Sequence, residues 1–153
     1  MAVAFLEKLE ELQGRLVELW VGFGTGTHLR FIPAHEISRK LGPQVSNAIP
    51  FFHTFTGCDT VSCFYGRGKK TAMDVWNSFP EATTAFLTLG GMPPEVNDTS
   101  MAILERFVVL LYDRISTKTS VNDPRKQLFV KKGRQFDNIP PTRASPIGTF
   151  KTC

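Results

Sequence analysis

A glycine-rich turn between two apolar helical patterns, Gly66-Arg67-Gly68-Lys69-Lys70, limits most strongly what this chain can fold into. The two glycines allow backbone N–H groups to face outward together, and a helix expected to start at Lys69 adds a partial positive charge. Such a turn is suited to binding an anionic oxygen, most simply that of a phosphate. The alternative is an ordinary glycine turn followed by a solvated, basic helix start.

The spacing around this turn resembles the helix-hairpin-helix of the flap-endonuclease-like 5′-nucleases, whose core is a PIN-like domain. In that family an apolar helix ends in a Gly-(Ser/Cys)-Asp motif, and a short helix and a Gly-x-Gly-x-Lys hairpin follow. The residues at the family's offsets are Gly57-Cys58-Asp59, Phe64, Gly66, Gly68, Lys70 and Ala72. A weaker resemblance extends from about Leu19 to Arg143. The chain is also similar to nuclease-like open reading frames that occur in many copies in animal genomes.

The resemblance implies an α/β, mostly helical chain with a truncated PIN-like 5′-nuclease fold. This partial domain would cover residues 1–143, with edge strands followed by helices and a helix-hairpin-helix at about 57–79. A single domain is also the natural expectation for 153 residues. Residues 144–153 show no periodicity, and we expect them to form a disordered tail.

In the nuclease family the aspartate that matches Asp59 helps to line a two-metal site, where Mg²⁺ ions assist phosphodiester hydrolysis. Most of the other carboxylates of such a site are not found here, since the N-terminal region has only Glu7, Glu10 and Glu11 on an expected helix face. Asp59 is therefore either a surviving metal ligand or the cap of a short helix beginning near Thr60. We expect the chain alone to be catalytically incomplete, whereas a complete parent enzyme would depend on Mg²⁺.

The resemblance assigns Gly66, Gly68, Lys69 and Lys70 to the backbone of duplex or branched DNA, and a monovalent cation to the same hairpin. Backbone contacts position a protein on DNA without reading its sequence. We therefore expect weak, sequence-nonspecific DNA binding. Two other interpretations remain open. The chain is an inactive remnant with a structural or protein-interaction role, or another chain supplies the missing carboxylates and completes an enzyme.

Charge is distributed unevenly along the chain. Residues 1–98 contain 8 Lys/Arg and 10 Asp/Glu, whereas residues 99–153 contain 10 and 4. Asp123 and Gly133 are suited to begin and end a basic helix. The cationic side chains of this secondary basic patch are Arg125, Lys126, Lys131 and Lys132. An excess of positive charge favours an anionic partner, although a solvated lysine-rich face is an equally simple explanation.

The cysteine pattern favours a reducing compartment. Cys58, Cys63 and Cys153 form neither a Cys-x-x-Cys pair nor an even set. We therefore expect an intracellular protein, and a nuclear location would fit a DNA partner. No secretory signal is visible, and the longest apolar run, from Phe107 to Tyr112, is too short to cross a bilayer. No membrane partner is expected.

The N-terminal third predicts the only β-structure. The apolar, β-prone run from Leu16 to Phe23 predicts a buried strand. A turn at Gly24–Gly26 and a second short strand, His28–Ile32, are expected to follow. Such an incomplete sheet would expose an edge and part of an apolar face, which favours self-association of the isolated chain.

The rest of the chain reads as helices. An amphipathic helix is expected around Phe5–Leu12, and further helices from Pro33 to Leu41 and from Pro43 into Gly57. Pro50 is expected to kink or divide the latter. Three more helices are predicted at 69–79, 81–89 and 99–115.

Overall fold

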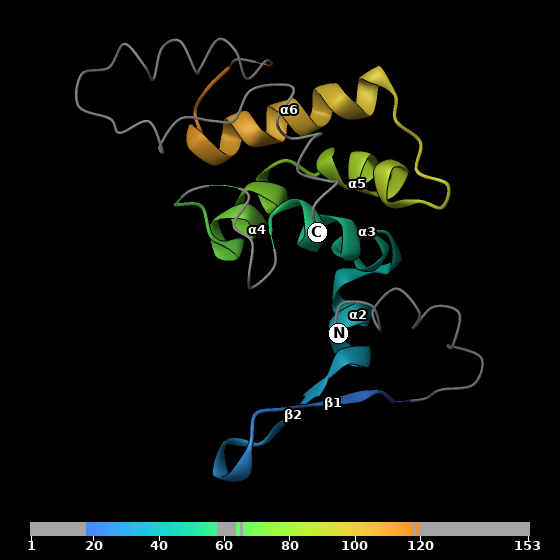
Figure 1. Cartoon of the computed structure of the whole chain (residues 1–153), viewed down its shortest axis with the longest axis vertical. Coiled ribbons are helices and arrows are strands. Elements are labelled where there is room, and N and C mark those ends of the chain that lie inside the picture. Colours follow the sequence, from blue (N-terminus) through green and yellow to red (C-terminus); the bar gives the residue numbers. More distant parts are fainter. Residues whose placement is uncertain (1–17, 58–63, 65, 118, 120–153) are drawn as a thin grey trace. The chain divides into compact units, whose positions relative to one another are not determined.

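The computed structural model describes residues 18–57, 64, 66–117 and 119. Within these residues the protein has one two-stranded antiparallel sheet and five α-helices, so it is mostly helical with a small β-component, as predicted (Figure 1). The chain divides into two compact units, residues 1–50 and residues 51–153. Helix α3, Pro43–Phe55, spans the boundary between them.

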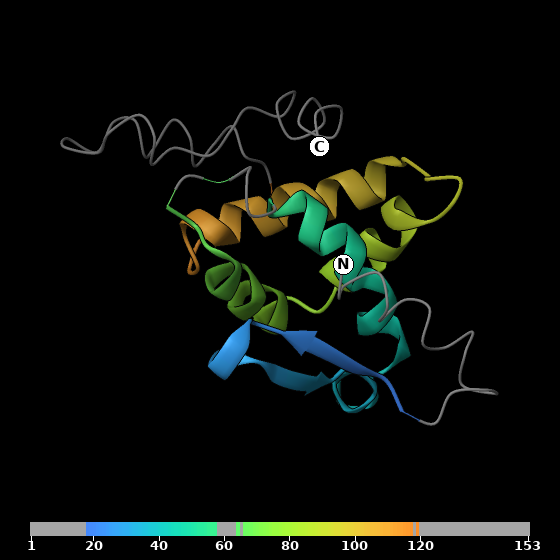
Figure 2. The same cartoon turned by 60° about the horizontal axis from the view of Figure 1, so that its bottom comes forward.

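The first unit contains a β-hairpin, coloured blue in Figure 2. Strand β1, Trp20–Phe23, pairs with β2, Arg30–Pro33, so that Trp20 lies opposite Pro33 and Phe23 opposite Arg30. A 3-10 turn at Gly26–His28 joins them, which places His28 in the turn and not in the second strand. Gly24 is required here, because its φ is 99° and a Cβ would lie 2.4 Å from the carbonyl oxygen of His28.

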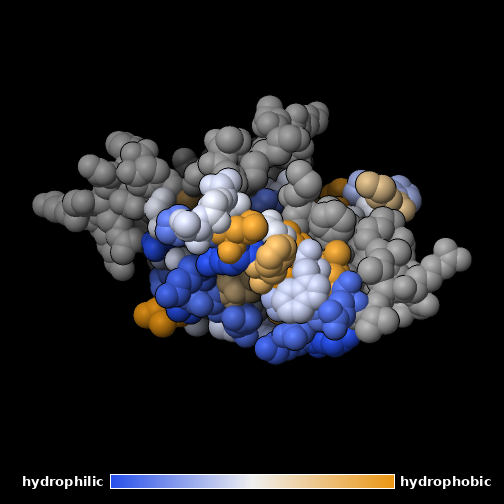
Figure 3. Space-filling view, turned by 90° about the horizontal axis from the view of Figure 1, so that it is seen from below, coloured by the Kyte–Doolittle hydropathy of each residue, from blue (hydrophilic) through white to orange (hydrophobic). Residues whose placement is uncertain are grey.

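The expectation that the first strand is buried is wrong. Trp20 is 50% exposed and Phe23 is 58% exposed. In the described part of the chain β1 pairs only with β2, and a two-stranded sheet cannot cover its own faces. Figure 3, which views the molecule from below, accordingly shows apolar and near-neutral side chains among hydrophilic ones.

A buried histidine connects the residue just before β1 to the helix that follows the hairpin. Helix α2, Ala34–Leu41, places the ring of His35 so that its Nδ1 lies 3.1 Å from the nitrogen and 3.0 Å from the oxygen of Leu19. In one neutral tautomer of the ring, Nδ1 accepts from the amide of Leu19. In the other, Nδ1 donates to the carbonyl oxygen of Leu19, so either tautomer can bond this residue. Gly42 ends α2 with a φ of 77°, as its sequence position predicted.

Helix α3 contains Pro50 but is not divided by it. The helix is continuous from Pro43 to Phe55, and Pro50 lies within it. A proline cannot donate to the carbonyl four residues earlier, so one helical hydrogen bond is missing there. The helix ends at Phe55, and the amide of Thr56 still donates to the carbonyl of Phe52, at 3.0 Å. Thr56 and Gly57 follow it directly and become important at the candidate site.

Three helices of the second unit match the predicted ones closely. They are α4, Lys69–Ser78, α5, Ala82–Gly90, and α6, Asp98–Tyr112. Both α4 and α5 pack against α6 (Figure 2). The last helix ends three residues before the predicted end at Ile115, whose side chain is 91% exposed and has nothing to gain from continued helical packing.

An aromatic core holds the second unit together. The ring of Phe86 is fully buried and lies 5.0 Å from that of Trp76 and 5.3 Å from that of Phe107, both edge-to-face. Phe52 and Phe55, from the end of α3, lie 5.9 Å and 6.1 Å from the same ring. Offset and edge-to-face pairs at these distances are favourable beyond their burial. The core therefore joins the end of α3 to α4, α5 and α6.

The N-terminus of α6 is capped by Asn97, and this cap gives a first testable prediction. Its side-chain oxygen accepts from the amide of Ser100 at 2.7 Å. We expect Asn97→Ala to lower the free energy of unfolding by about 1 kcal/mol, because an amide at the helix start loses its acceptor. Chemical denaturation followed by circular dichroism measures this. Asn97→Ser should retain most of the stability, and equal losses in both variants would contradict a capping role.

Candidate nucleic-acid interface

The hairpin that the sequence singled out leads directly into α4. The amide of Arg67 donates to the carbonyl of Phe64 at 3.1 Å, and Gly66 adopts a φ of 67°, a conformation that favours glycine. Gly68 is extended and precedes the first residue of α4, with no side-chain hydrogen bond to cap the helix in the described part of the chain. The first amides of α4 therefore keep the partial positive charge of a helix start.

The ammonium of Lys69 lies against the end of α3. Its Nζ donates to the carbonyl oxygen of His53 at 2.8 Å, to the hydroxyl of Thr56 at 2.7 Å and to the carbonyl oxygen of Gly57. The same nitrogen is 5.7 Å from the centroid of the Phe52 ring, within cation–π range. An ammonium has three hydrogens, and here each has an oxygen acceptor.

These contacts give Lys69 a structural role. A cation beside the last carbonyls of a helix satisfies oxygens that have no partner within the helix and offsets their partial negative charge. Lys69 therefore links the end of α3 to the start of α4. The contact of Lys69 with a DNA backbone stays a prediction. Because its three ammonium hydrogens already have acceptors, we expect Lys69 to contribute to DNA binding indirectly, by holding the hairpin in position.

The side of the hairpin that faces water carries Lys70. Lys70, Gly66 and Gly68 are all exposed. Arg67 is half-buried, and its guanidinium carbon lies 5.2 Å from the centroid of the Tyr112 ring at the end of α6. Burial raises the pKa of the Tyr112 phenol, and the positive charge of Arg67 partly opposes that rise. The hairpin thus presents one exposed lysine beside an arginine held on an aromatic ring.

Several predicted site residues lie outside the described residues. These are Asp59, the proposed metal ligand, and the secondary basic patch of Arg125, Lys126, Lys131 and Lys132. Within residues 18–57, 64, 66–117 and 119, no three His, Cys, Asp or Glu side chains are close enough to share a metal ion. Because Asp59 lies outside these residues, the Mg²⁺ site stays a prediction, and we derive no chemistry through it.

The monovalent cation that the resemblance implies at the hairpin stays a prediction. The oxygens that surround the ammonium near the hairpin belong to His53, Thr56 and Gly57, and Lys69 already binds all three. A potassium or sodium ion at these oxygens would have to displace the lysine. The ammonium supplies the positive charge that such an ion would bring.

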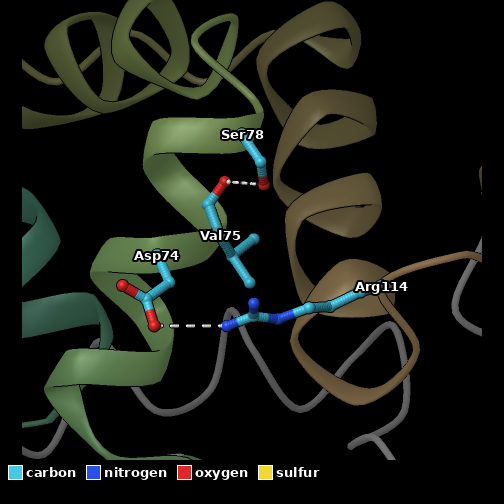
Figure 4. A network of polar contacts seen from close by, with 4 residues as sticks. All are labelled: Asp74, Val75, Ser78 and Arg114. Carbon is cyan, nitrogen blue, oxygen red and sulfur yellow. Dashed lines mark hydrogen bonds and ion pairs between the residues drawn. The ribbon is translucent and has the colours of Figure 1, made fainter.

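An ion pair links the middle of α4 to the segment that follows α6. Asp74 and Arg114 approach to 3.3 Å, and Arg114 comes from the segment that follows α6 (Figure 4). In the next turn the hydroxyl of Ser78 donates to the carbonyl oxygen of Val75 at 2.8 Å, near the end of the helix. Both partners of the ion pair are about half exposed, so it contributes about 1 kcal/mol or less.

The groups that contact Lys69 and Arg67 were not predicted from the sequence. The acceptors of Lys69 include two backbone carbonyls, which carry no side-chain signal, and Tyr112 lies far along the chain from Arg67. One available signal was the position of Thr56, a hydroxyl directly after an apolar helix. Its Oγ1 also donates to the carbonyl oxygen of Phe52 at 2.7 Å.

Comparison of the chain with models of protein families, with curated proteins and with solved structures gave no match. In the described part of the chain no helix has the length and apolar character needed to cross a membrane. The candidate interface therefore rests on its own geometry.

Proposed function

We propose that this chain binds the phosphate backbone of nucleic acid through the hairpin and the start of α4, without reading sequence. The contacts would come from the amides that follow Gly68 and from the side chain of Lys70, with Arg67 adding positive charge beside them. Duplex or branched DNA is the partner that the resemblance to 5′-nucleases implies. We do not assign a reaction to the chain.

The observation that carries this proposal is the exposed start of α4 beside Lys70, where Gly68, the residue before the helix, supplies no capping side chain. Gly68 brings no side chain to the helix start, and a Cβ built there would meet nothing within 4 Å. A phosphate oxygen could therefore approach the backbone closely. A helix dipole and an ammonium together favour a dianionic or monoanionic oxygen over a neutral ligand.

A second candidate function is a structural or protein-interaction role for an inactive remnant. The observation that favours it is the position of Lys69, whose ammonium is committed to the end of α3. In this case the glycines and lysines form a stable turn and no more. The two candidates predict different results for the two adjacent lysines.

Replacing Lys70 should weaken DNA binding. We expect the wild-type chain to bind duplex DNA with a Kd on the order of 10⁻⁴ to 10⁻⁶ M that increases with salt. Lys70→Met should reduce the slope of log K against log salt by about 0.9, because one phosphate contact is lost. Fluorescence anisotropy of labelled duplex and branched DNA at several salt concentrations measures both quantities.

Lys69→Met is the matched control, since it removes the same charge from the adjacent residue. If the proposal is correct, Lys70→Met changes the salt slope, whereas Lys69→Met, compared at equal foldedness, leaves it close to the wild-type value. If Lys70→Met binds like the wild type, or if no DNA binds, the turn is structural and the second candidate function is favoured.

A further inference from the structure

The oxygens around the ammonium of Lys69 all come from one short stretch of chain. They are the carbonyl oxygens of His53 and Gly57 and the hydroxyl oxygen of Thr56. This stretch is the last turn of α3 and the two residues that follow it. The ring of Phe52, from the same turn, is within cation–π range of the ammonium nitrogen. We call the three oxygens the α3 oxygen cluster.

The α3 oxygen cluster presents acceptors to the ammonium. The hydroxyl hydrogen of Thr56 is used in a bond to the carbonyl oxygen of Phe52 at 2.7 Å, so Oγ1 offers only lone pairs to a further partner. The amide of Gly57 donates to the carbonyl oxygen of Thr54 at 3.2 Å, and this shorter step ends the α-helical pattern. Carbonyls at the end of a helix carry partial negative charge. The cluster therefore attracts a cation because of how α3 ends.

The cation that fills the cluster is attached to the other helix. Lys69 is the first residue of α4 and lies 12 positions after Gly57. Thr56 and Gly57 are buried, whereas the lysine is exposed, so its long side chain reaches the cluster from the surface. Without that side chain, a small ion in solution would have access to the same oxygens.

We propose that the α3 oxygen cluster is a binding site for a compact monovalent cation, which the chain fills with its own Lys69 ammonium. The position of the hairpin then depends on a tethered cation and not on one taken from solution. The wild-type chain should therefore respond to ionic strength but not to the identity of the monovalent cation. A chain without the Lys69 ammonium should take a dissolved cation in its place.

The test uses two salts of equal charge and concentration. Methylammonium has the same three-hydrogen head as lysine, whereas tetramethylammonium has no hydrogen to donate. The melting temperature of Lys69→Ala should be about 2–4 °C higher in methylammonium chloride, because a ligand that binds only the folded state stabilises it. Equal melting temperatures of Lys69→Ala in the two salts would overturn the proposal.

The wild type and Lys70→Ala are the matched controls. Lys70→Ala removes the adjacent exposed lysine and leaves the α3 oxygen cluster filled. Neither control should distinguish methylammonium from tetramethylammonium, which separates binding at the cluster from general effects of the two salts. A methylammonium effect of equal size in Lys70→Ala and in Lys69→Ala would contradict a site at the cluster.

Removing one oxygen locates the cation. Thr56→Val, combined with Lys69→Ala, should reduce the methylammonium effect, and an unchanged effect would place the cation elsewhere. If Lys69→Ala is unfolded in dilute buffer, the helical circular-dichroism signal replaces the melting temperature. The signal should then return in methylammonium chloride but not in tetramethylammonium chloride. A variant that stays unfolded in both salts would also overturn the proposal.

Duplex binding by the wild type gives a second measurement, which rests on the proposed function. The Kd should be the same in potassium chloride and in tetramethylammonium chloride at one ionic strength. Tighter binding in potassium chloride would favour the dissolved cation predicted from the resemblance and overturn this proposal.

The two proposals can fail separately. If no duplex binds, the phosphate proposal is wrong, and the melting temperatures of Lys69→Ala still decide the cation proposal. If Lys70→Met weakens duplex binding while Lys69→Ala melts equally in the two ammonium salts, the phosphate proposal stands and the cation proposal is wrong.

Discussion

Phe86→Ala should lower the free energy of unfolding of the second unit by about 3–5 kcal/mol. The Phe86 side chain is fully buried, and its ring packs against rings from α3, α4 and α6. The substitution removes the buried apolar surface and leaves a cavity that the surrounding rings can fill only in part. Since small domains have a total stability of about 5–15 kcal/mol, this is the largest single effect that we expect.

Urea denaturation followed by the helical circular-dichroism signal measures this loss. Phe86→Leu should cost less than Phe86→Ala, because it fills more of the cavity. Phe31→Ala is the matched control, since it makes the same change where the side chain is 65% exposed, and it should cost far less. A similar loss for Phe86→Ala and Phe31→Ala would show that the ring cluster does not stabilise the unit.

Lys69→Met should produce the second largest loss of stability, about 1.5–3 kcal/mol. The substitution keeps much of the aliphatic length but removes three charge-assisted hydrogen bonds to His53, Thr56 and Gly57. Because the lysine side chain is exposed, water replaces part of what is lost, which favours the lower end of the range. Thermal unfolding and urea denaturation measure the effect.

Lys70→Met provides the control for this prediction. Lys70 is the adjacent exposed lysine, and its removal should change stability by about 0.5 kcal/mol or less. Lys69→Arg should lie between the wild type and Lys69→Met, since a planar guanidinium keeps the charge but cannot place three hydrogens as an ammonium does. Equal stabilities of Lys69→Met and Lys70→Met would refute the role of Lys69 at the end of α3.

The sequence was sufficient to locate most of the helices, because their ends carry local signals. Gly42 ends α2 in a left-handed conformation, and the glycines before Lys69 open α4. The helices predicted at 69–79 and 99–115 each bury apolar residues, such as Val75 and Phe107. Pro50 does not divide α3, because a helix tolerates one missing hydrogen bond when the turns on both sides are maintained.

Burial of the first strand could not be predicted from the strand alone. The run from Leu16 to Phe23 is as apolar as a central strand, but burial depends on how many strands and layers accompany it. In the described part of the chain β1 has β2 as its single partner. The same local sequence therefore gives an exposed aromatic surface instead of a core.

The contact of Lys69 with the end of α3 also could not be predicted from the local sequence. The spacing of the glycines placed both lysines at the start of a helix, and nothing in the spacing distinguished them. The difference arises because α3 ends where the ammonium of Lys69 can reach its carbonyls. Tertiary placement of a neighbouring helix end thus decides which of two adjacent lysines is available to a ligand.

The contact between Lys69 and Gly57 also closes a loop, since the two residues are 12 positions apart. Once both ends of a connection are fixed, the entropy of closing it grows only slowly with its length, by about 0.6 kcal/mol for each doubling. A longer connection between Gly57 and Phe64 would therefore cost little closure entropy, whereas Phe64 is buried and Gly66 needs its positive φ. Insertions there would diversify the surface next to the hairpin while the start of α4 stays where the lysine holds it.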